Sequence, residues 1–236
     1  MNTTNGLFLM FALCFCTMSL SAEKLQHATL KPQVIEGWTV RVDEKLLSED
    51  QEKTARILRN LRERLANIKI IIPQPHLEEL QKVALVLEKG HAELKAMQYH
   101  PGVEWLKNKG YDETLVHCVH LPVAGHLVAK RQITTQPWVI LHELAHAYHH
   151  QVLGFDNKEI IEAYEKFKAS GHGEDCLHYS GKRVEHYGLT NHKEFFAEMT
   201  EAYFGTNDFY PFNHGELKEA EPEIYELIEK IWKPTK

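Results

Sequence analysis

The sequence predicts an α+β fold, because two kinds of apolar pattern alternate along it. Apolar residues recur every three or four positions through Ile57, Leu61 and Leu65, which indicates an amphipathic helix facing a core. Short apolar runs such as 83–87 indicate buried strands instead. Hydrophobic residues make up 43 % and charged residues 25 % of the 236 positions, as in globular proteins that bury a core. No internal repeat or linker divides the chain.

In the first half, residues 29–42 show the partial alternation of a strand. Ser48 and the acidic residues after it indicate a helix start, and the apolar stripe continues this helix to about residue 65. Residues 68–72 fit either its last turn or a short strand, and Pro73 and Pro75 end the segment. A helical turn is expected at 77–80, a buried strand at 83–87, a turn at 99–102 and a strand at 115–121.

In the second half, helical periodicity predominates. Helices are expected over residues 138–148, 157–168, 191–204 and 219–232. The helix at 191–204 has the clearest start, because Asn191 is a good N-cap and Glu194 follows three residues later. Residues 170–189 have no periodicity and are expected to form a loop. Residues 207–212 are expected to form an aromatic turn.

The N-terminus has the pattern of a secretory signal peptide. Residues 6–16 are apolar, and small residues lead to a cleavage point near Ser21 or Ala22. The run is short for a membrane span. The first 22 residues contain no Lys or Arg, which departs from the usual signal pattern. We expect residues 1–22 to be a signal and residues 23–236 to form one domain, with or without a distinct N-terminal lobe over 23–110. The alternative is an uncleaved anchor or a buried N-terminal helix.

Cysteine usage and charge limit the function further. Cys118 and Cys176 remain after signal removal and could form a disulfide in an oxidising compartment, or stay as two separate buried thiols. The net charge of −6 gives no basic excess, so a nucleic-acid partner is not indicated. We expect a secreted or periplasmic protein with no stable membrane span after signal cleavage.

Residues 138–148 read WVILHELAHAY and contain the pattern His-Glu-x-x-His. His142 and His146 are four residues apart, so on a helix both imidazoles lie on one face and can bind one zinc ion. Glu143 would lie beside that ion as a candidate base. The alternative is a helix that carries two histidines without a metal.

A third ligand is needed, because catalytic zinc usually has three protein ligands and one open position. The helix at 191–204 presents Glu194 and Glu198 four residues apart on one face. One carboxylate could bind zinc while the other bonds a ligand histidine. The alternative is a solvated acidic stripe that also includes Glu201.

The segment 187–198 reads YGLTNHKEFFAE and follows the His-Glu-x-x-His helix by some forty residues. Together the two segments resemble the catalytic domain of anthrax toxin lethal factor and its relatives, which are zinc metallopeptidases of the gluzincin type. The match covers roughly residues 135–205. This chain lacks the toxin's large accessory domains, so delivery into a host cell is not implied, and its loop 170–186 has a sequence of its own.

The resemblance implies a zincin-like fold with an active-site helix, a small mixed sheet and a mostly helical C-terminal part. It implies that one zinc ion is bound by His142, His146 and Glu194. It also implies Glu143 as general base, Tyr187 as an oxyanion donor and Glu198 as the carboxylate behind a ligand histidine. An edge strand flanks the cleft in such folds, and residues 115–121 are our candidate, with an ordinary sheet strand as the alternative.

We therefore expect a secreted zinc metalloendopeptidase that acts on a peptide or protein substrate. Two other classes stay open at this point. One is a zinc-bearing binding or regulatory protein without useful turnover, and the other is a zinc hydrolase of non-peptide amides. Other histidines near these segments, His149, His150 and His186 among them, are expected to face solvent.

Overall fold

A computed structural model describes residues 27–234, so the signal segment predicted at residues 1–22 lies outside the described part of the chain. The elements in chain order are β1 Leu30–Ile35, β2 Trp38–Asp43, α1 Glu44–Glu49, α2 Gln51–Ile71, α3 His76–Gln81, β3 Leu85–Leu87, β4 Gln98–Tyr99, α4 Val103–Lys109, η1 Glu113–Leu115, β5 Val119–Leu121, η2 Ala124–Val128, α5 Lys130–Thr135, α6 Val139–Tyr148, η3 His149–Leu153, α7 Lys158–Ser170, β6 Cys176–Leu177, β7 Arg183–Val184, η4 Tyr187–Leu189, α8 His192–Phe204, α9 His214–Ala220 and α10 Pro222–Trp232.

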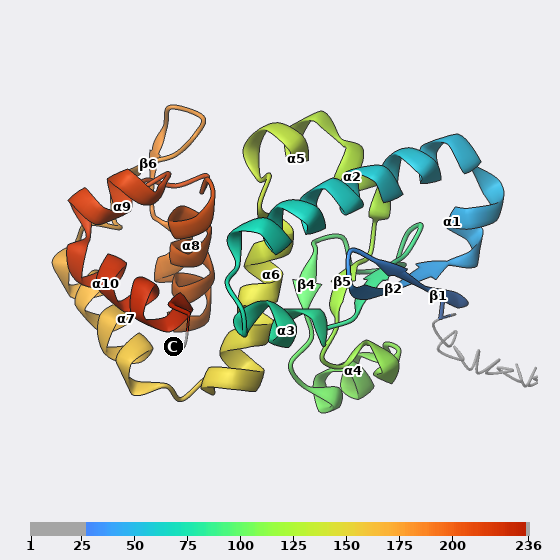
Figure 1. Cartoon of the computed structure of the whole chain (residues 1–236), viewed down its shortest axis with the longest axis horizontal. Helices are drawn as coiled ribbons and strands as arrows, with labels where there is room; N and C mark the ends of the chain where they lie inside the picture. The colour runs from blue at the N-terminus through green and yellow to red at the C-terminus, as the bar shows by residue number, and fades with distance from the viewer. Residues whose placement is uncertain (1–26, 235–236) are drawn as a thin grey trace, which may run out of the picture.

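The sheet and the C-terminal helices lie on opposite sides of α6 (Figure 1). The larger sheet has the strand order β1-β2-β3-β5-β4, with β2, β3 and β5 parallel and an antiparallel strand at each edge. Helices α7 to α10 form the other side. The predicted fold class is confirmed in its α+β architecture, with a small mixed sheet and a mostly helical C-terminal part.

The segment 29–42, expected to contain a strand, is a hairpin of two. Ile35 pairs with Trp38, which leaves Glu36 and Gly37 as a two-residue turn. Both have positive φ, 50° and 99°, as the tight turn between twisted strands requires. Alternation continues through the turn, so the pattern alone did not reveal the break.

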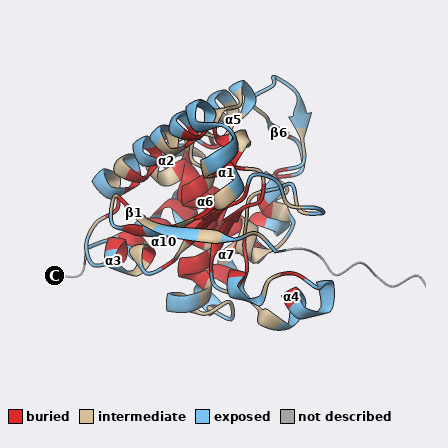
Figure 2. Ribbon diagram, turned by 90° about the vertical axis from the view of Figure 1, so that its right-hand side faces the viewer, coloured by how far each residue is buried: buried red, intermediate tan, exposed pale blue. Residues whose placement is uncertain are grey.

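Helix α2 begins later than we expected and ends in one of the two ways that the sequence left open. Its N-cap is Asp50, whose side chain accepts from the amide of Lys53, while Ser48 lies inside the short helix α1. Residues 68–71 continue the helix, and Ile72 is its C-cap. Its buried face, which includes Ile57, packs in the main core (Figure 2, where the outer face is blue).

The strand expected at 115–121 covers only Val119–Leu121 and lies inside the sheet, between β3 and β4. Our candidate edge strand was therefore wrong. A 3-10 turn capped by Asp112 occupies residues 113–115, and His117 has a positive φ of 58°, so pairing starts late. The edge strand next to β5 is β4, in a segment where we expected a turn.

Aromatic packing joins the two central helices. Trp232 of α10 stacks on Tyr148 of α6 at 4.6 Å and lies near-parallel to Phe196 of α8 at 6.1 Å between ring centroids. At the other end, Gly205 allows close approach to α6, since a Cβ there would lie 2.3 Å from the indole nitrogen of Trp138. Large aromatic side chains with this much burial dominate core stability.

The remaining C-terminal elements refine the prediction. The expected loop 170–189 contains the hairpin β6–β7 and the turn η4. The helix expected from residue 219 is α10, which begins at Pro222, with α9 as a separate helix before it. Cys118 and Cys176 are separate buried thiols, the second of our two alternatives.

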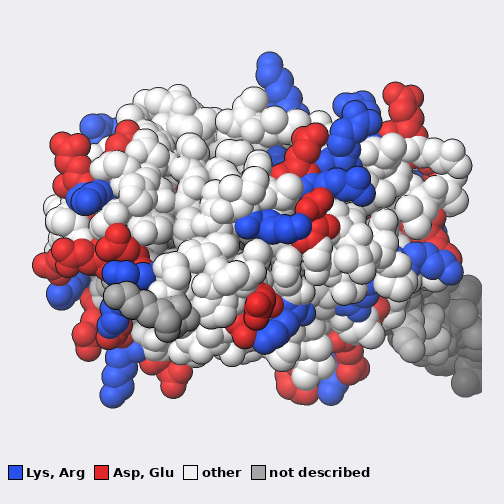
Figure 3. Space-filling model, in the orientation of Figure 1, with Lys and Arg blue, Asp and Glu red and all other residues white. Residues whose placement is uncertain are grey.

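Charged side chains of both signs are interspersed on the face shown in Figure 3. Across residues 27–234, no helix combines the length and the apolar character that crossing a bilayer needs.

Candidate metal centre

Helix α6 presents His142, Glu143 and His146 from a largely buried position. His142 is 8 % and Glu143 7 % exposed, and the two apolar residues between Glu143 and His146 are buried in the core. The segment that enters α6 is held by Arg64 of α2, whose Nη1 donates to the Pro137 carbonyl at 2.7 Å and to that of Gln136 at 3.3 Å. The start of α6 is thus fixed from outside the helix, since its N-cap Trp138 makes no capping bond through its side chain.

Helix α8 presents the acidic side chains. Its N-cap Asn191 accepts hydrogen bonds from the amides of Lys193 at 2.9 Å and Glu194 at 3.2 Å, as the sequence predicted for a cap. Glu194 therefore leaves the first turn of α8 in a fixed position, next to α6.

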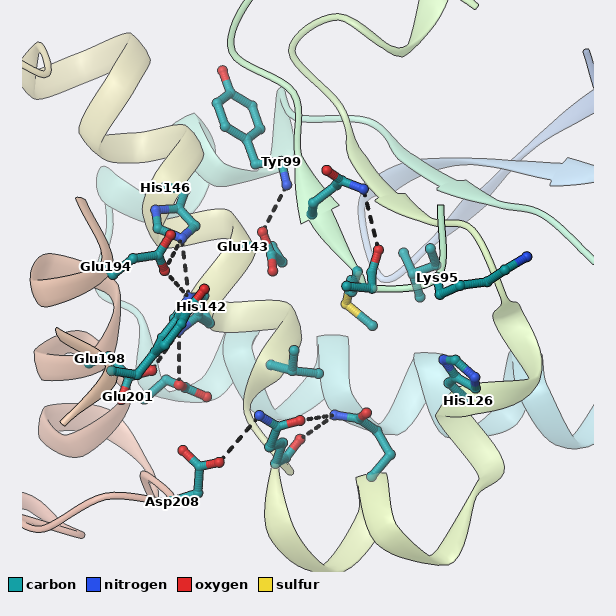
Figure 4. A pocket seen from close by; sticks show the side chains of 18 of the residues that line it. Lys95, Tyr99, His126, His142, Glu143, His146, Glu194, Glu198, Glu201 and Asp208 are labelled. Carbon is teal, nitrogen blue, oxygen red and sulfur yellow. Dashed lines mark hydrogen bonds and ion pairs between the residues drawn. The ribbon is translucent and has the colours of Figure 1, made fainter. Parts of the chain in front are cut away.

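The structure brings His142, His146 and Glu194 together. The two Nε2 atoms lie 3.1 Å apart, and Glu194 Oε2 is 3.2 Å from that of His142 and 3.1 Å from that of His146 (Figure 4). Zinc bonds of about 2.0–2.1 Å in a tetrahedral site put ligand atoms about 3.3 Å apart. Two imidazoles and one carboxylate at these spacings fit a zinc ion with one position left open.

The candidate ligands shift the pKa values of one another. Burial acts to lower the pKa of His142, but hydrogen bonds with Glu194 and Glu201 outweigh it and raise that pKa well above its usual value. Burial acts to raise the pKa of Glu194, yet hydrogen bonds from His142 and His146 hold it far below the usual range. Glu194 is therefore ionised, as a metal ligand must be.

The side chain of Glu143 is bound by the edge strand. Its Oε2 accepts a hydrogen bond of 2.8 Å from the backbone amide of Tyr99 in β4, whereas Oε1 accepts none from the described residues. Burial raises the pKa of Glu143, and the neighbouring His146 and His142 partly oppose this shift. A carboxylate with one oxygen fixed and a raised pKa is suited to accepting a proton.

On its other side, His142 meets two carboxylates. Its Nδ1 lies 3.0 Å from Glu201 Oε2 and 3.5 Å from Glu198 Oε1. Only the shorter contact is a hydrogen bond. The resemblance assigned this place to Glu198, and Glu201 was named only within the alternative of a solvated acidic stripe. Glu201 is seven residues after Glu194 and therefore on the same helical face.

Tyr187 lies at the start of the turn η4 and lines the same cleft. Its side chain is partly open to solvent, with 47 % exposure. Burial of the rest raises the pKa of its hydroxyl, and Glu194 adds to the shift. The hydroxyl forms no hydrogen bond within residues 27–234, so it is available to a ligand.

These groups line one cleft of about 800 Å³. Its walls come from α6 and α8 on the metal side and from β4, η2 and α5 on the other. Arg131, Gln132 and Gln136 line the α5 side, and His178 and Phe209 line the end nearest β6. The volume is typical of a ligand site.

Two histidines that we expected to face solvent are buried. His149 is 0 % and His186 1 % exposed. Burial lowers the pKa of each to about 3. His149 lies among Phe155 and Phe196, and His186 accepts the Gly188 amide at 2.9 Å beside Phe167. Both side chains therefore pack in the interior, away from solvent.

Comparisons with known proteins add little to this geometry. No protein-family model matches the chain, and no curated protein does. Among solved structures, the chain is similar to the PRO-PRO endopeptidase (PPEP-2) from Paenibacillus alvei, with 20 % identity over 77 % of this chain and 90 % of that one, at a TM-score of 0.40. We draw nothing about this chain from a likeness of that size.

Proposed function

We propose that this protein is a secreted zinc metallopeptidase that hydrolyses peptide bonds. The supporting observation is the convergence of His142, His146 and Glu194 at zinc-ligand spacing, next to the buried carboxylate of Glu143. A zinc ion held there would supply a Lewis acid and lower the pKa of its water to about 7. The rest of the chemistry falls to the chain's own residues.

Glu143 accepts the proton of the attacking water and later passes it to the leaving amine. The Tyr99 amide keeps one oxygen of Glu143 in place, so the free oxygen Oε1 takes the proton. Tyr187 donates from its hydroxyl to the oxyanion that develops at the peptide carbonyl, a contact strongest in the transition state.

The segment 187–198 supports the same roles through its resemblance to the lethal factor family. In that family the equivalents of His142, His146 and Glu194 bind zinc. Secretion is supported by the apolar segment 6–16 followed by small residues. Two alternatives use the same geometry: a zinc-bearing binding protein and a hydrolase of non-peptide amides. A buried base with a free oxygen favours turnover over simple binding.

The test is peptide-library cleavage by the purified protein with measured zinc content. We expect cleavage that a chelator abolishes and zinc restores. Glu143→Gln should reduce kcat by about 10²–10⁴-fold while zinc content stays at the wild-type level. Glu162→Gln on α7, outside the cleft, is the matched control and should cleave normally. Zinc without cleavage of any peptide would favour one of the two alternatives, and an active Glu143→Gln protein would exclude the proposed base.

A further inference from the structure

Three carboxylates line the cleft on the side of His142 away from His146, as Figure 4 shows. Glu198 and Glu201 come from α8, and Asp208 follows that helix. They are 3 %, 6 % and 8 % exposed. We call these three residues the acidic recess. Because buried carboxylates are costly without partners, their partners need to be counted.

Few donors serve the acidic recess. His142 Nδ1 can donate one proton, and Glu201 takes it at 3.0 Å. Gln136 Nε2 donates to Asp208 Oδ2 at 3.3 Å. Glu198 Oε2 is buried and has no hydrogen-bond partner. At least one carboxylate oxygen is thus unpartnered in a buried position at the cleft wall.

Cationic side chains of the chain do not fill the deficit. Among residues 27–234, no lysine or arginine forms an ion pair with Glu198, Glu201 or Asp208. His178 Nε2 comes no nearer than 4.0 Å to Asp208 Oδ2. Lys95 and His126 lie on the opposite wall in Figure 4, and the ammonium of Lys95 donates to the carbonyls of His91 and Ala92.

Two of these carboxylates lie close together, because Glu198 and Glu201 each have an oxygen within 4.8 Å of the other's. Burial raises the pKa of Asp208, and Glu201 adds to the shift. A positive charge placed among these groups would relieve both burial and repulsion.

We propose that the acidic recess binds a positively charged group of the peptide substrate, an ammonium or guanidinium, next to the scissile bond. The inference rests on the proposed peptidase function, since it names the substrate class of the same cleft. Two sources supply this chemistry: the side chain of Lys or Arg, and the free N-terminal ammonium of a peptide.

Peptide pairs separate these sources. In one arm, Lys replaces norleucine at each position around the cleaved bond in an otherwise neutral peptide. In the other arm, a free N-terminus replaces an acetylated one at varied distance from that bond. We expect one substitution to raise kcat/KM by about tenfold or more, which equals about 1.4 kcal/mol. Equal rates for every charged and neutral pair would overturn the proposal.

Asp208→Asn tests where the preference arises. Asp208 contacts none of the three candidate ligands, and Asn keeps its shape. We expect the ratio of kcat/KM between the charged and neutral peptide to fall by about tenfold. The control is Asp175→Asn, which removes the same charge from an exposed side chain outside the cleft and should keep the wild-type ratio. If Asp208→Asn kept the wild-type ratio of kcat/KM, the preference for a charged peptide would not arise in the acidic recess, and the proposal would be overturned.

A binding measurement keeps this proposal distinct from the peptidase function. The zinc-loaded Glu143→Gln protein is titrated with the same peptide pairs by calorimetry. If the charged peptide binds more tightly but wild type cleaves neither peptide, the cation-binding proposal stands and the peptidase proposal fails. If wild type cleaves both peptides without a charge preference, the peptidase proposal stands and the cation-binding proposal fails. Two zinc ions per chain in the wild type, reduced to one in Glu201→Gln, would instead identify the recess as a second metal site.

Discussion

The imidazole of His142 lies between Glu201 at Nδ1 and Glu194 at Nε2. Donation from Nδ1 to Glu201 leaves Nε2 as the atom that would bind a metal ion. A carboxylate behind a ligand histidine sets the ring's tautomer and raises its basicity. Glu201 is the nearer of the two carboxylates, which leads to a prediction that separates them.

Glu201→Gln should weaken zinc binding by about 10–100-fold, because the imidazole loses its charged acceptor. Glu198→Gln should have a smaller effect, since its contact with Nδ1 is 3.5 Å. Competition with a chromophoric chelator measures both affinities. Glu226→Gln, an exposed position on α10, is the control. If zinc affinity fell only in Glu198→Gln, Glu198 and not Glu201 would be the carboxylate that supports His142.

Tyr187→Phe should lower kcat by about 10²–10³-fold, the effect of removing one oxyanion donor. Zinc content and the melting temperature should stay close to wild type, because the hydroxyl makes no hydrogen bond within residues 27–234. Steady-state kinetics with metal analysis tests this. Tyr179→Phe, another exposed tyrosine, serves as control. Loss of metal in Tyr187→Phe would show a structural role instead.

At the scale of elements, α8 matters because its first turn places Glu194. Asn191→Ala removes the acceptor of two amides and should cost about 1 kcal/mol of stability. We also expect weaker zinc binding, because the turn that carries Glu194 loosens. Asn213→Ala is the matched control: Asn213 caps α9 with the same two bonds, at 3.0 and 3.2 Å, away from the metal centre. Equal zinc affinity in the two variants would contradict the expected link.

The sequence predicted elements well where the pattern was local. Helix α8 was found from its Asn191 cap and apolar stripe, and α6 from its motif. Strand β4 was missed because two residues carry no alternation, and only pairing with β5 defines the strand. The three candidate ligands could be proposed from spacing and resemblance. Glu201 could not, because the choice between it and Glu198 depends on how α8 rotates against α6.

At the scale of the whole molecule, Trp232 joins the two helices that carry the candidate ligands. Its indole packs between Tyr148 and Phe196, and its Nε1 donates to Thr200 at 3.3 Å. His76 adds a bond of 2.7 Å to the Tyr148 hydroxyl. The relative position of α6 and α8, and therefore the metal geometry, depends on packing from the last helix of the chain.

Buried neutral histidines should make the fold acid-sensitive. Burial lowers the pKa of His100, His149 and His186 to about 3. The unfolded chain binds their protons near the ordinary value of about 6.5, so their contribution is present above that pH and is lost as pH falls toward 3. Each should remove on the order of 2 kcal/mol between about pH 7 and pH 5.

Chemical denaturation across this pH range tests the expectation. His186→Gln should flatten the decline in unfolding free energy relative to wild type. Gln33→Ala, a partly exposed position on β1 that carries no titratable group, should leave the decline unchanged. A decline of the same slope in His186→Gln would contradict the role of that histidine.

The bond from β4 to Glu143 also bears on how this protein's relatives would be compared. The donor is the main-chain amide of Tyr99, which every amino acid except proline possesses. A different side chain at position 99 would keep this bond, although the buried Tyr99 side chain has contacts of its own through its hydroxyl, with His150 and Gln151. An alignment column that varies there, yet excludes proline, would be the signature of this contact, and conservation scores alone would overlook it.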